Sequence, residues 1–218
     1  MTCAMTARRL IALAERGSMS NDSGQSTAAI QIKVVRELRT ELAALACLTA
    51  FYGIEMAKSL NWTTAQRYAA SCQAEAMVKT GHSRMYMATI EGNLPIGMIL
   101  TTRTSDRGIR RLDALWVAEQ YRGRGVARRL FQEACRGGAD FHSFATPNAV
   151  AWHFANGFHP LGEREDEGTI EMFTGSYHPE YTVSVAVPSF TEMDMATIRD
   201  LEQFERERDP MDEPQPKN

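Results

Sequence analysis

The feature that most constrains the fold is an apolar segment that runs into a glycine-containing turn and then into an amphipathic helix. The apolar segment spans residues 109–117, and the turn carries Gly123 and Gly125. The helix that follows places apolar residues on one side, and residues 141–147 then read as another strand. A strand, helix and strand in this order require a parallel crossover. We therefore expect a sheet of mixed direction.

The rest of the chain supplies further strands and helices. Residues 30–38 alternate like a first strand, residues 40–60 have helical spacing, and Thr63 and Thr64 offer a cap for a second helix ending near Lys79. Residues 85–93 and 94–104 resemble two arms of a hairpin, residues 148–158 a short helix, and residues 158–174 two more strands around an acidic turn. The pattern predicts an α/β fold with a central mixed sheet of six to seven strands and helices on both faces.

Composition excludes several classes of protein. With 218 residues, 44% hydrophobic and 23% charged, the chain can bury a real core, which argues against wholesale disorder, a collagen or a coiled coil. A net charge of −3 gives no global attraction to nucleic acid, so any anion site has to be local. The four cysteines have no paired close spacing that would indicate a disulfide framework. No segment is apolar enough to span a bilayer. No spacing of His and Cys residues predicts a metal site. We expect reduced thiols and a cytoplasmic protein.

The glycine-containing turn is a candidate anion site. Backbone N–H groups at the start of a helix bind phosphate, helped by the positive end of the helix dipole. Four arginines surround this turn: Arg122, Arg124, Arg128 and Arg129. The alternative interpretation is an ordinary helix start with solvated arginines, and the turn alone does not decide between the two.

The wider context favours the anion site. Gln120, Gly123 and Gly125 form Q-x-x-G-x-G after the strand, and a helix led by Asn148 ends at Gly157-Phe158 about thirty residues later. This arrangement resembles the GNAT superfamily of acyl-CoA-dependent N-acyltransferases over residues 30–174. A classical dinucleotide site is disfavoured, because Arg128 stands where its third glycine would be.

The resemblance implies a cofactor site at a splayed part of the sheet. The backbone between Arg122 and Ala127 would hold the pyrophosphate of coenzyme A, and Arg128 or Arg129 would reach an outer phosphate. Leu115, Trp116 and Val117 would pair with the pantetheine arm, the Val117 N–H would polarise the thioester carbonyl, and Asn148 would face the cofactor. The full predicted set is Leu115, Trp116, Val117, Gln120, Arg122, Gly123, Arg124, Gly125, Val126, Ala127, Arg128 and Asn148.

The resemblance also implies two catalytic roles. His153 stands four residues before Gly157, where many members have a tyrosine that protonates the departing thiolate. An imidazole can do this chemistry, although His153 could equally pack beside Trp152 and Phe154. Asp113 is the candidate general base, and its alternative role is a salt bridge with Arg110 or Arg111.

We therefore expect an N-acetyltransferase that moves an acetyl group from acetyl-CoA to an amine by direct attack in a ternary complex. Two alternatives stay open: a non-catalytic acyl-CoA-binding sensor or docking module, and a macromolecular acceptor such as a protein amino terminus, a lysine or an aminoacyl-tRNA. A basic hairpin tip is the hint of a macromolecular acceptor, and the alternative interpretation of this tip is a solvated loop. Its residues are Arg103, Arg107, Arg110 and Arg111. No membrane partner is expected.

The sequence divides into three parts. Residues 1–29 read as a flexible leader, for which Met19 is an alternative start, and residues 30–175 as the acyltransferase domain. Residues 176–218 form an extension with a strand at 182–188, a charged helix at 190–208 and a disordered end. Our hypothesis is that this extension covers a sheet edge or exchanges with a second copy in a homodimer.

Overall fold

A seven-stranded sheet forms the centre of the part of the chain that the computed structural model describes, residues 30–35, 42–90, 94–162, 168–177, 179 and 192–208. The strands are β1 (Gln31–Val35), β2 (Ser83–Ile90), β3 (Leu94–Arg103), β4 (Ile109–Val117), β5 (Asp140–Ala145), β6 (His159–Pro160) and β7 (Ile170–Phe173). Their order across the sheet is β1-β2-β3-β4-β5-β7-β6. All neighbours are antiparallel except β4 and β5, which are parallel. The predicted mixed sheet and its parallel crossover are confirmed.

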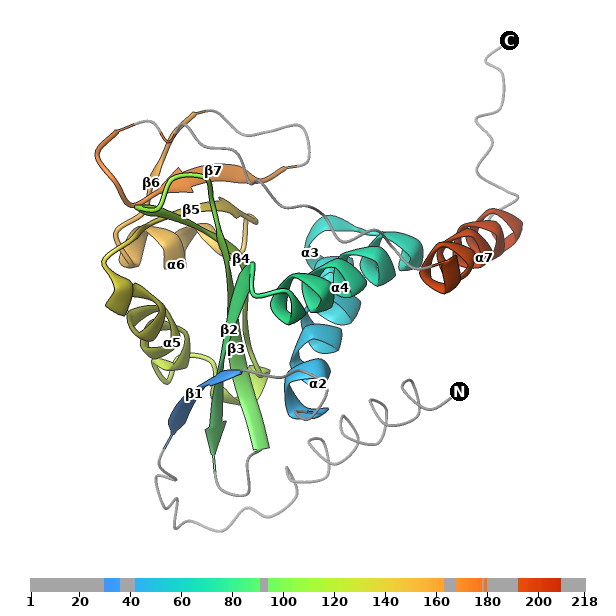
Figure 1. Cartoon of the computed structure of the whole chain (residues 1–218), viewed down its shortest axis with the longest axis horizontal. Helices are drawn as coiled ribbons and strands as arrows, with labels where there is room; N and C mark the ends of the chain where they lie inside the picture. Colours follow the sequence, from blue (N-terminus) through green and yellow to red (C-terminus); the bar gives the residue numbers. More distant parts are fainter. Residues whose placement is uncertain are drawn as a thin grey trace.

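One face of the sheet is covered by helices from the first third of the chain (Figure 1). They are α2 (Leu42–Ala50), a π-helical turn (Phe51–Glu55), α3 (Met56–Leu60) and α4 (Thr64–Lys79). Thr63 caps α4 as predicted, in a reciprocal pair of hydrogen bonds with Gln66. The helix predicted at residues 40–60 is divided by the π turn into α2 and α3, and the spacing of apolar residues does not reveal such a turn. Buried methionines of β2 and β3 pack under this layer.

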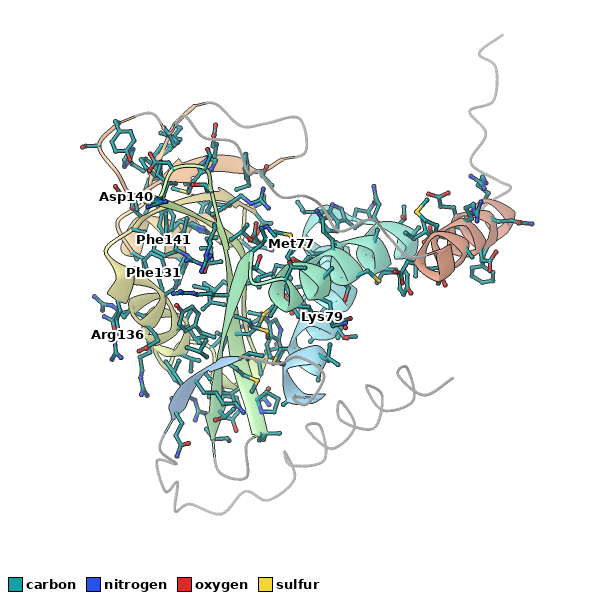
Figure 2. All side chains as sticks on the ribbon, viewed as in Figure 1. Met77, Lys79, Phe131, Arg136, Asp140 and Phe141 are labelled. Atoms are coloured by element: carbon teal, nitrogen blue, oxygen red, sulfur yellow. The ribbon has the colours of Figure 1, made fainter. Side chains whose placement is uncertain are left out.

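The opposite face carries α5 (Val126–Ala134) and α6 (Val150–Ala155) (Figure 1). Phe131 of α5 and Phe141 of β5 meet edge to face, with ring centroids 5.1 Å apart, and Figure 2 shows them between the helix and the sheet. The expectation of helices on both faces is therefore confirmed. Within the described residues, no helix is long and apolar enough to cross a membrane.

The helix predicted in the extension is α7 (Glu192–Arg208). It packs against α4, on the side of the helical layer remote from the sheet (Figure 1). Asp194 lies near Tyr68 and Cys72, whereas Glu205 accepts a hydrogen bond from the Thr64 N–H, so the two helices run antiparallel. The predicted leader, the strand at 182–188, the end at 209–218 and the turns at 91–93 and 163–167 lie outside the described residues.

Candidate active site

A cleft of about 950 Å³ opens where β4 and β5 diverge. Its walls come from the π turn and α4 on one side, the end of β4 and the glycine-containing turn in the middle, and β5 with the start of α6 on the other. A cleft of this size suits a ligand larger than most metabolites. The sequence-predicted strand, turn and downstream helix therefore meet around one cavity.

The divergence of β4 and β5 leaves part of β4 without a strand partner. The two strands pair from Ile109 to Leu112, whereas β4 continues to Val117. The N–H of Ala118 donates to the Ile96 carbonyl at 2.9 Å. Because peptide groups alternate between the two sides of an antiparallel strand, those of Leu115 and Val117 face away from β3 and toward the gap. The backbone of Trp116 then faces β3, and its side chain lines the cleft.

The turn beside this gap presents an uncapped helix start. Gly123 and Gly125 have φ of 75° and 76°, in the left-handed region that favours glycine. Gly125 is the N-cap of α5 and supplies no side chain to bond the first-turn N–H groups. Those groups have no partner within the helix, so they are available to an anion.

The four arginines of the turn have different surroundings. Arg122 donates from Nε to the Val117 carbonyl and from Nη2 to Glu55 Oε1, both at 3.0 Å, and so ties the turn to the π turn. Arg124 lies over the Tyr121 ring at 5.5 Å, and Arg129 donates to the Ile30 carbonyl at 3.0 Å. Arg128 lines the cleft. It is therefore the better placed of the two arginines predicted to reach an outer phosphate.

Ten of the twelve residues predicted to bind the cofactor line the cleft. Gln120 and Arg124 are exposed and do not line it. The ten are Leu115, Trp116, Val117, Arg122, Gly123, Gly125, Val126, Ala127, Arg128 and Asn148. Their roles toward coenzyme A stay predictions.

Asp113 lies at a β-bulge. The register between β3 and β4 pairs Leu100 with Ala114 and Thr101 with Leu112, which leaves Asp113 as the extra residue. Its carboxylate lines the cleft, pairs with Arg111 and accepts a hydrogen bond from Thr102. Burial raises the pKa of this carboxyl group, and the Arg111 charge opposes the rise. Asp113 is thus both salt-bridged and exposed to the cleft.

His153 is buried against β5, with 4% of its surface exposed, and it also lines the cleft. Its Nδ1 lies 2.9 Å from the Ala149 carbonyl oxygen, and its Nε2 lies 3.0 Å from Ser143 Oγ. The Trp152 and Phe158 rings pack on the imidazole edge to face. Burial lowers the pKa of His153, and the hydrogen bond to Ala149 opposes that effect.

Ser143 and Tyr52 are among the cleft residues that the sequence prediction missed. Ser143 follows the buried Phe141 by two positions on β5, so strand alternation could have predicted that both side chains lie on the same face of the sheet. No feature of the sequence indicated that this serine is buried. Tyr52 is buried on the π turn, and burial together with the negative charge of Asp113 raises its pKa. Its position follows from the π turn, which the spacing of apolar residues does not predict.

The predicted basic hairpin tip is divided between the two faces of the sheet. Arg111 faces the cleft side and pairs with Asp113. Arg110 donates to the Thr101 side chain and carbonyl on the other face, directly opposite Arg103. Among the described residues, no group of three or more His, Cys, Asp or Glu side chains could hold a metal ion.

Comparisons of the sequence and of the fold with known proteins agree with each other. A sequence model of the acetyltransferase (GNAT) family matches residues 44–158. The fold is similar to an acyl-CoA N-acyltransferase from Pseudomonas aeruginosa (14% identity, TM-score 0.53, covering 67% of this chain and 100% of that one). It is also similar to a GNAT family acetyltransferase from Staphylococcus aureus (13%, 0.51, 66% and 98%) and a GNAT family N-acetyltransferase from Escherichia coli in complex with CoA (15%, 0.50, 69% and 84%). Comparison with curated protein sequences finds no match.

Proposed function

Because the chain belongs to the acetyltransferase (GNAT) family, we propose that it transfers an acetyl group from acetyl-CoA to an amine by direct attack within a ternary complex. The observation that carries this proposal is the gap between β4 and β5, which opens directly beside the uncapped start of α5. The gap offers unpaired peptide groups to a pantetheine arm, and the helix start offers N–H groups to a pyrophosphate. The structure of the E. coli N-acetyltransferase with a similar fold is that of its complex with CoA.

The thioester carbonyl would lie against the Val117 N–H. This group faces the gap, and the turn that follows holds the Val117 carbonyl through Arg122 at 3.0 Å. A fixed N–H donor stabilises the negative charge that develops on the carbonyl oxygen during attack. The donor costs no reorganisation at that moment, because the strand already holds it in place.

Two protons leave the acceptor during the reaction. Asp113 takes the first from the substrate ammonium, which gives the neutral amine that attacks the thioester carbon. The C–N bond forms and the nitrogen gives its second proton to His153. The C–S bond then breaks, and His153 passes this proton to the departing thiolate. Asp113 then returns its proton to solvent, so the products are the amide, free CoA and one proton.

The acceptor half of the cleft favours an amine with an apolar body. The side chains on this wall are mostly aromatic and aliphatic: Phe51, Tyr52, Met56, Leu60, Trp62 and Met77. Two acidic groups also line the cleft, Glu55, which pairs with Arg122, and Asp113, which would attract an ammonium. The wall gives the binding energy, and the carboxylate orients the reacting nitrogen.

We assign this activity to residues 30–175 and treat residues 176–218 as an extension. Among the residues that the structure describes, those that line the cleft lie between 51 and 169, which supports this division. The free cysteines Cys47, Cys72 and Cys135 are compatible with a reducing compartment, and we place the enzyme in the cytoplasm.

Release of free thiol from acetyl-CoA in the presence of a panel of amines tests the proposal. We expect release with amines that carry an apolar or aromatic body, and none without an acceptor. CoA binding with no release for any amine would instead identify a non-catalytic sensor. Transfer to a peptide amino terminus, a lysine or an aminoacyl-tRNA, with an acceptor affinity that falls steeply with salt, would identify a macromolecular acceptor.

A further inference from the structure

Three groups at the wall of the cleft form a continuous chain of hydrogen bonds. The Ala149 carbonyl oxygen lies 2.9 Å from His153 Nδ1, and His153 Nε2 lies 3.0 Å from Ser143 Oγ. Ser143 and His153 are 3% and 4% exposed, and both line the cleft. Both side chains therefore lie at the cleft wall, and the hydroxyl group contacts the imidazole nitrogen that does not face Ala149.

The chemistry of Ala149 decides which nitrogen of the imidazole carries the proton. A carbonyl oxygen only accepts hydrogen bonds, so Nδ1 has to be the N–H donor. In the neutral imidazole, Nε2 is then a bare acceptor, and the Ser143 hydroxyl donates to it. Neutral His153 thus has no proton to offer the cleft, because its N–H is bound to Ala149 and its lone pair is bound to Ser143.

Ser143 occupies the point where the two central strands separate. It pairs with Leu112 in the last matched position of β4 and β5, and its Oγ also lies 3.4 Å from the Leu112 carbonyl oxygen. Beyond this position β4 runs on through Asp113 to Val117, the residues that would surround the thioester. The hydroxyl group thus lies beside the strand segment that would surround the thioester, and it also contacts His153 Nε2.

On the basis of the proposed acetyl transfer, we propose that Ser143 is a catalytic residue that carries a proton from the attacking amine to the leaving thiolate, with His153 acting through it. After the C–N bond forms, the positively charged nitrogen gives its proton to Ser143 Oγ as the Ser143 hydroxyl proton moves to His153 Nε2. When the C–S bond breaks, the imidazolium returns this proton through Ser143 to the sulfur. The serine and the histidine end as they began, and no other reactant is consumed.

The surroundings of His153 suit a proton acceptor that holds its charge briefly. The imidazole is packed by Trp152 of its own helix, by Phe158 after it, and by Ser143 of β5, none of which is charged. Burial among such groups disfavours a lasting imidazolium, which is the property required of a relay that must release its proton. The Ala149 carbonyl fixes the ring orientation, the role that a third group plays in other hydroxyl–histidine pairs.

Variants of both residues test the relay in the full-length protein with acetyl-CoA and an amine that supports thiol release. We expect Ser143→Ala to lower kcat by about 10²-fold, with little change in the affinity for CoA. His153→Gln should lose a similar factor, and the double variant should be no worse than either single change, because the two groups act as one unit. Ser143→Thr keeps the hydroxyl group and should recover most of the rate.

A pH profile separates catalysis from packing. The parent kcat at saturating amine should fall toward acid pH as His153 becomes protonated and can no longer accept a proton. This fall in kcat should be absent in both Ser143→Ala and His153→Gln, which keep only the acid limb that Asp113 contributes to kcat/KM for the amine. His142→Gln is the matched control, because His142 is the neighbouring buried histidine on β5, bonds Glu171 at 2.7 Å and does not line the cleft. Its kcat should equal that of the parent.

The outcomes distinguish the relay from the proposed function. If the parent protein binds CoA but releases no thiol with any amine, the acetyl transfer itself is wrong. If the parent is active and Ser143→Ala keeps its kcat and its acid limb, the relay alone is overturned and His153 acts directly or not at all. Losses that multiply in the double variant would also overturn it, because they would mean that the two residues act separately.

Discussion

Gly125 illustrates how one residue can position an anion site by its backbone alone. A side chain at Gly125 would meet no atom within 4 Å, so the residue is not required for space. Its φ of 76° costs an L-amino acid about 1–2 kcal/mol, which is why glycine is needed at the N-cap of α5. Two glycines at a strand-to-helix junction are a strong local signal of a tight turn, so the sequence was sufficient to locate this one.

We expect Gly125→Ala to destabilise the protein by about 1 kcal/mol and to weaken CoA binding several-fold, because the first-turn N–H groups would shift. Urea unfolding and isothermal titration with CoA measure the two effects. Gly137→Ala is the control, since Gly137 has neither a positive φ nor an atom near its Cβ position. Equal CoA affinity in parent and Gly125→Ala would show that the turn does not bind the phosphates.

Asp113 should control the acid side of the pH profile of kcat/KM for the amine, whereas His153 should control that of kcat. The carboxylate has to be unprotonated to accept the proton of an ammonium, and burial raises its pKa above the usual range. The rate therefore rises as pH increases through this raised pKa. Asp113→Asn should lower kcat/KM for the amine by about 10²- to 10⁴-fold and remove that limb from the profile.

Glu119→Gln serves as the control for Asp113→Asn, because Glu119 follows the same strand but is exposed and does not line the cleft. Its profile should match that of the parent. An Asp113→Asn variant that keeps the acidic limb would assign Asp113 to its salt bridge with Arg111 and leave the base to be found elsewhere.

At the scale of elements, strands β3 and β4 contain an unfavourable cross-strand pair of like charges. Arg103 and Arg110 lie directly opposite each other, and burial together with the charges of Arg84 and Arg103 lowers the pKa of Arg110. Like charges across a strand pair are destabilising. The sequence predicted a basic tip here but did not divide it between two faces, although Arg110 and Arg111 are neighbours on β4 and therefore point to opposite faces of the sheet.

Arg103→Gln should therefore stabilise the protein, by about 0.2–1 kcal/mol, and the gain should shrink at high salt because ions screen the repulsion. Urea midpoints at low and high ionic strength provide the measurement. Arg136→Gln is the comparison, because Arg136 is exposed and has a carboxylate partner, Glu133, at 3.0 Å. We expect almost no change there. A destabilised Arg103→Gln would mean that the arginine contributes packing that outweighs the repulsion.

For the whole molecule, the hydrophobic pattern was sufficient to predict the order of the elements. Helices such as α5 bury one regular face, and the central strands β2 and β3, buried on both faces, are mostly apolar. The cleft required more, because it depends on two local irregularities. The π turn brings Tyr52 and Glu55 to the cleft, and the bulge turns Asp113 and Ala114 toward the same helical layer. Ser143 illustrates the same limit, because its hydrogen-bond partner lies ten residues away on another element. Such contacts follow from tertiary packing and leave no local pattern.

The extension should stabilise the domain without contributing to the cleft. Within the described residues α7 packs on α4, and Glu205 accepts from the first turn of that helix. Burial acts to raise the pKa of Glu205, but the hydrogen bonds from Thr64 and Ala65 lower it overall. A carboxyl group with a lowered pKa stabilises the folded state above its unfolded pKa, near 4.5, and this contribution is lost as pH falls through the lower folded value.

We therefore expect a chain ending at Tyr177 to melt at a lower temperature than the full chain, with an unchanged KM for acetyl-CoA. The difference in Tm should be largest near neutral pH and should shrink in acid, as Glu205 becomes protonated. Light scattering of the same two proteins tests our hypothesis of exchange between copies. A full-length dimer that becomes a monomer on truncation would establish the exchange, whereas the same oligomeric state in both proteins would rule it out.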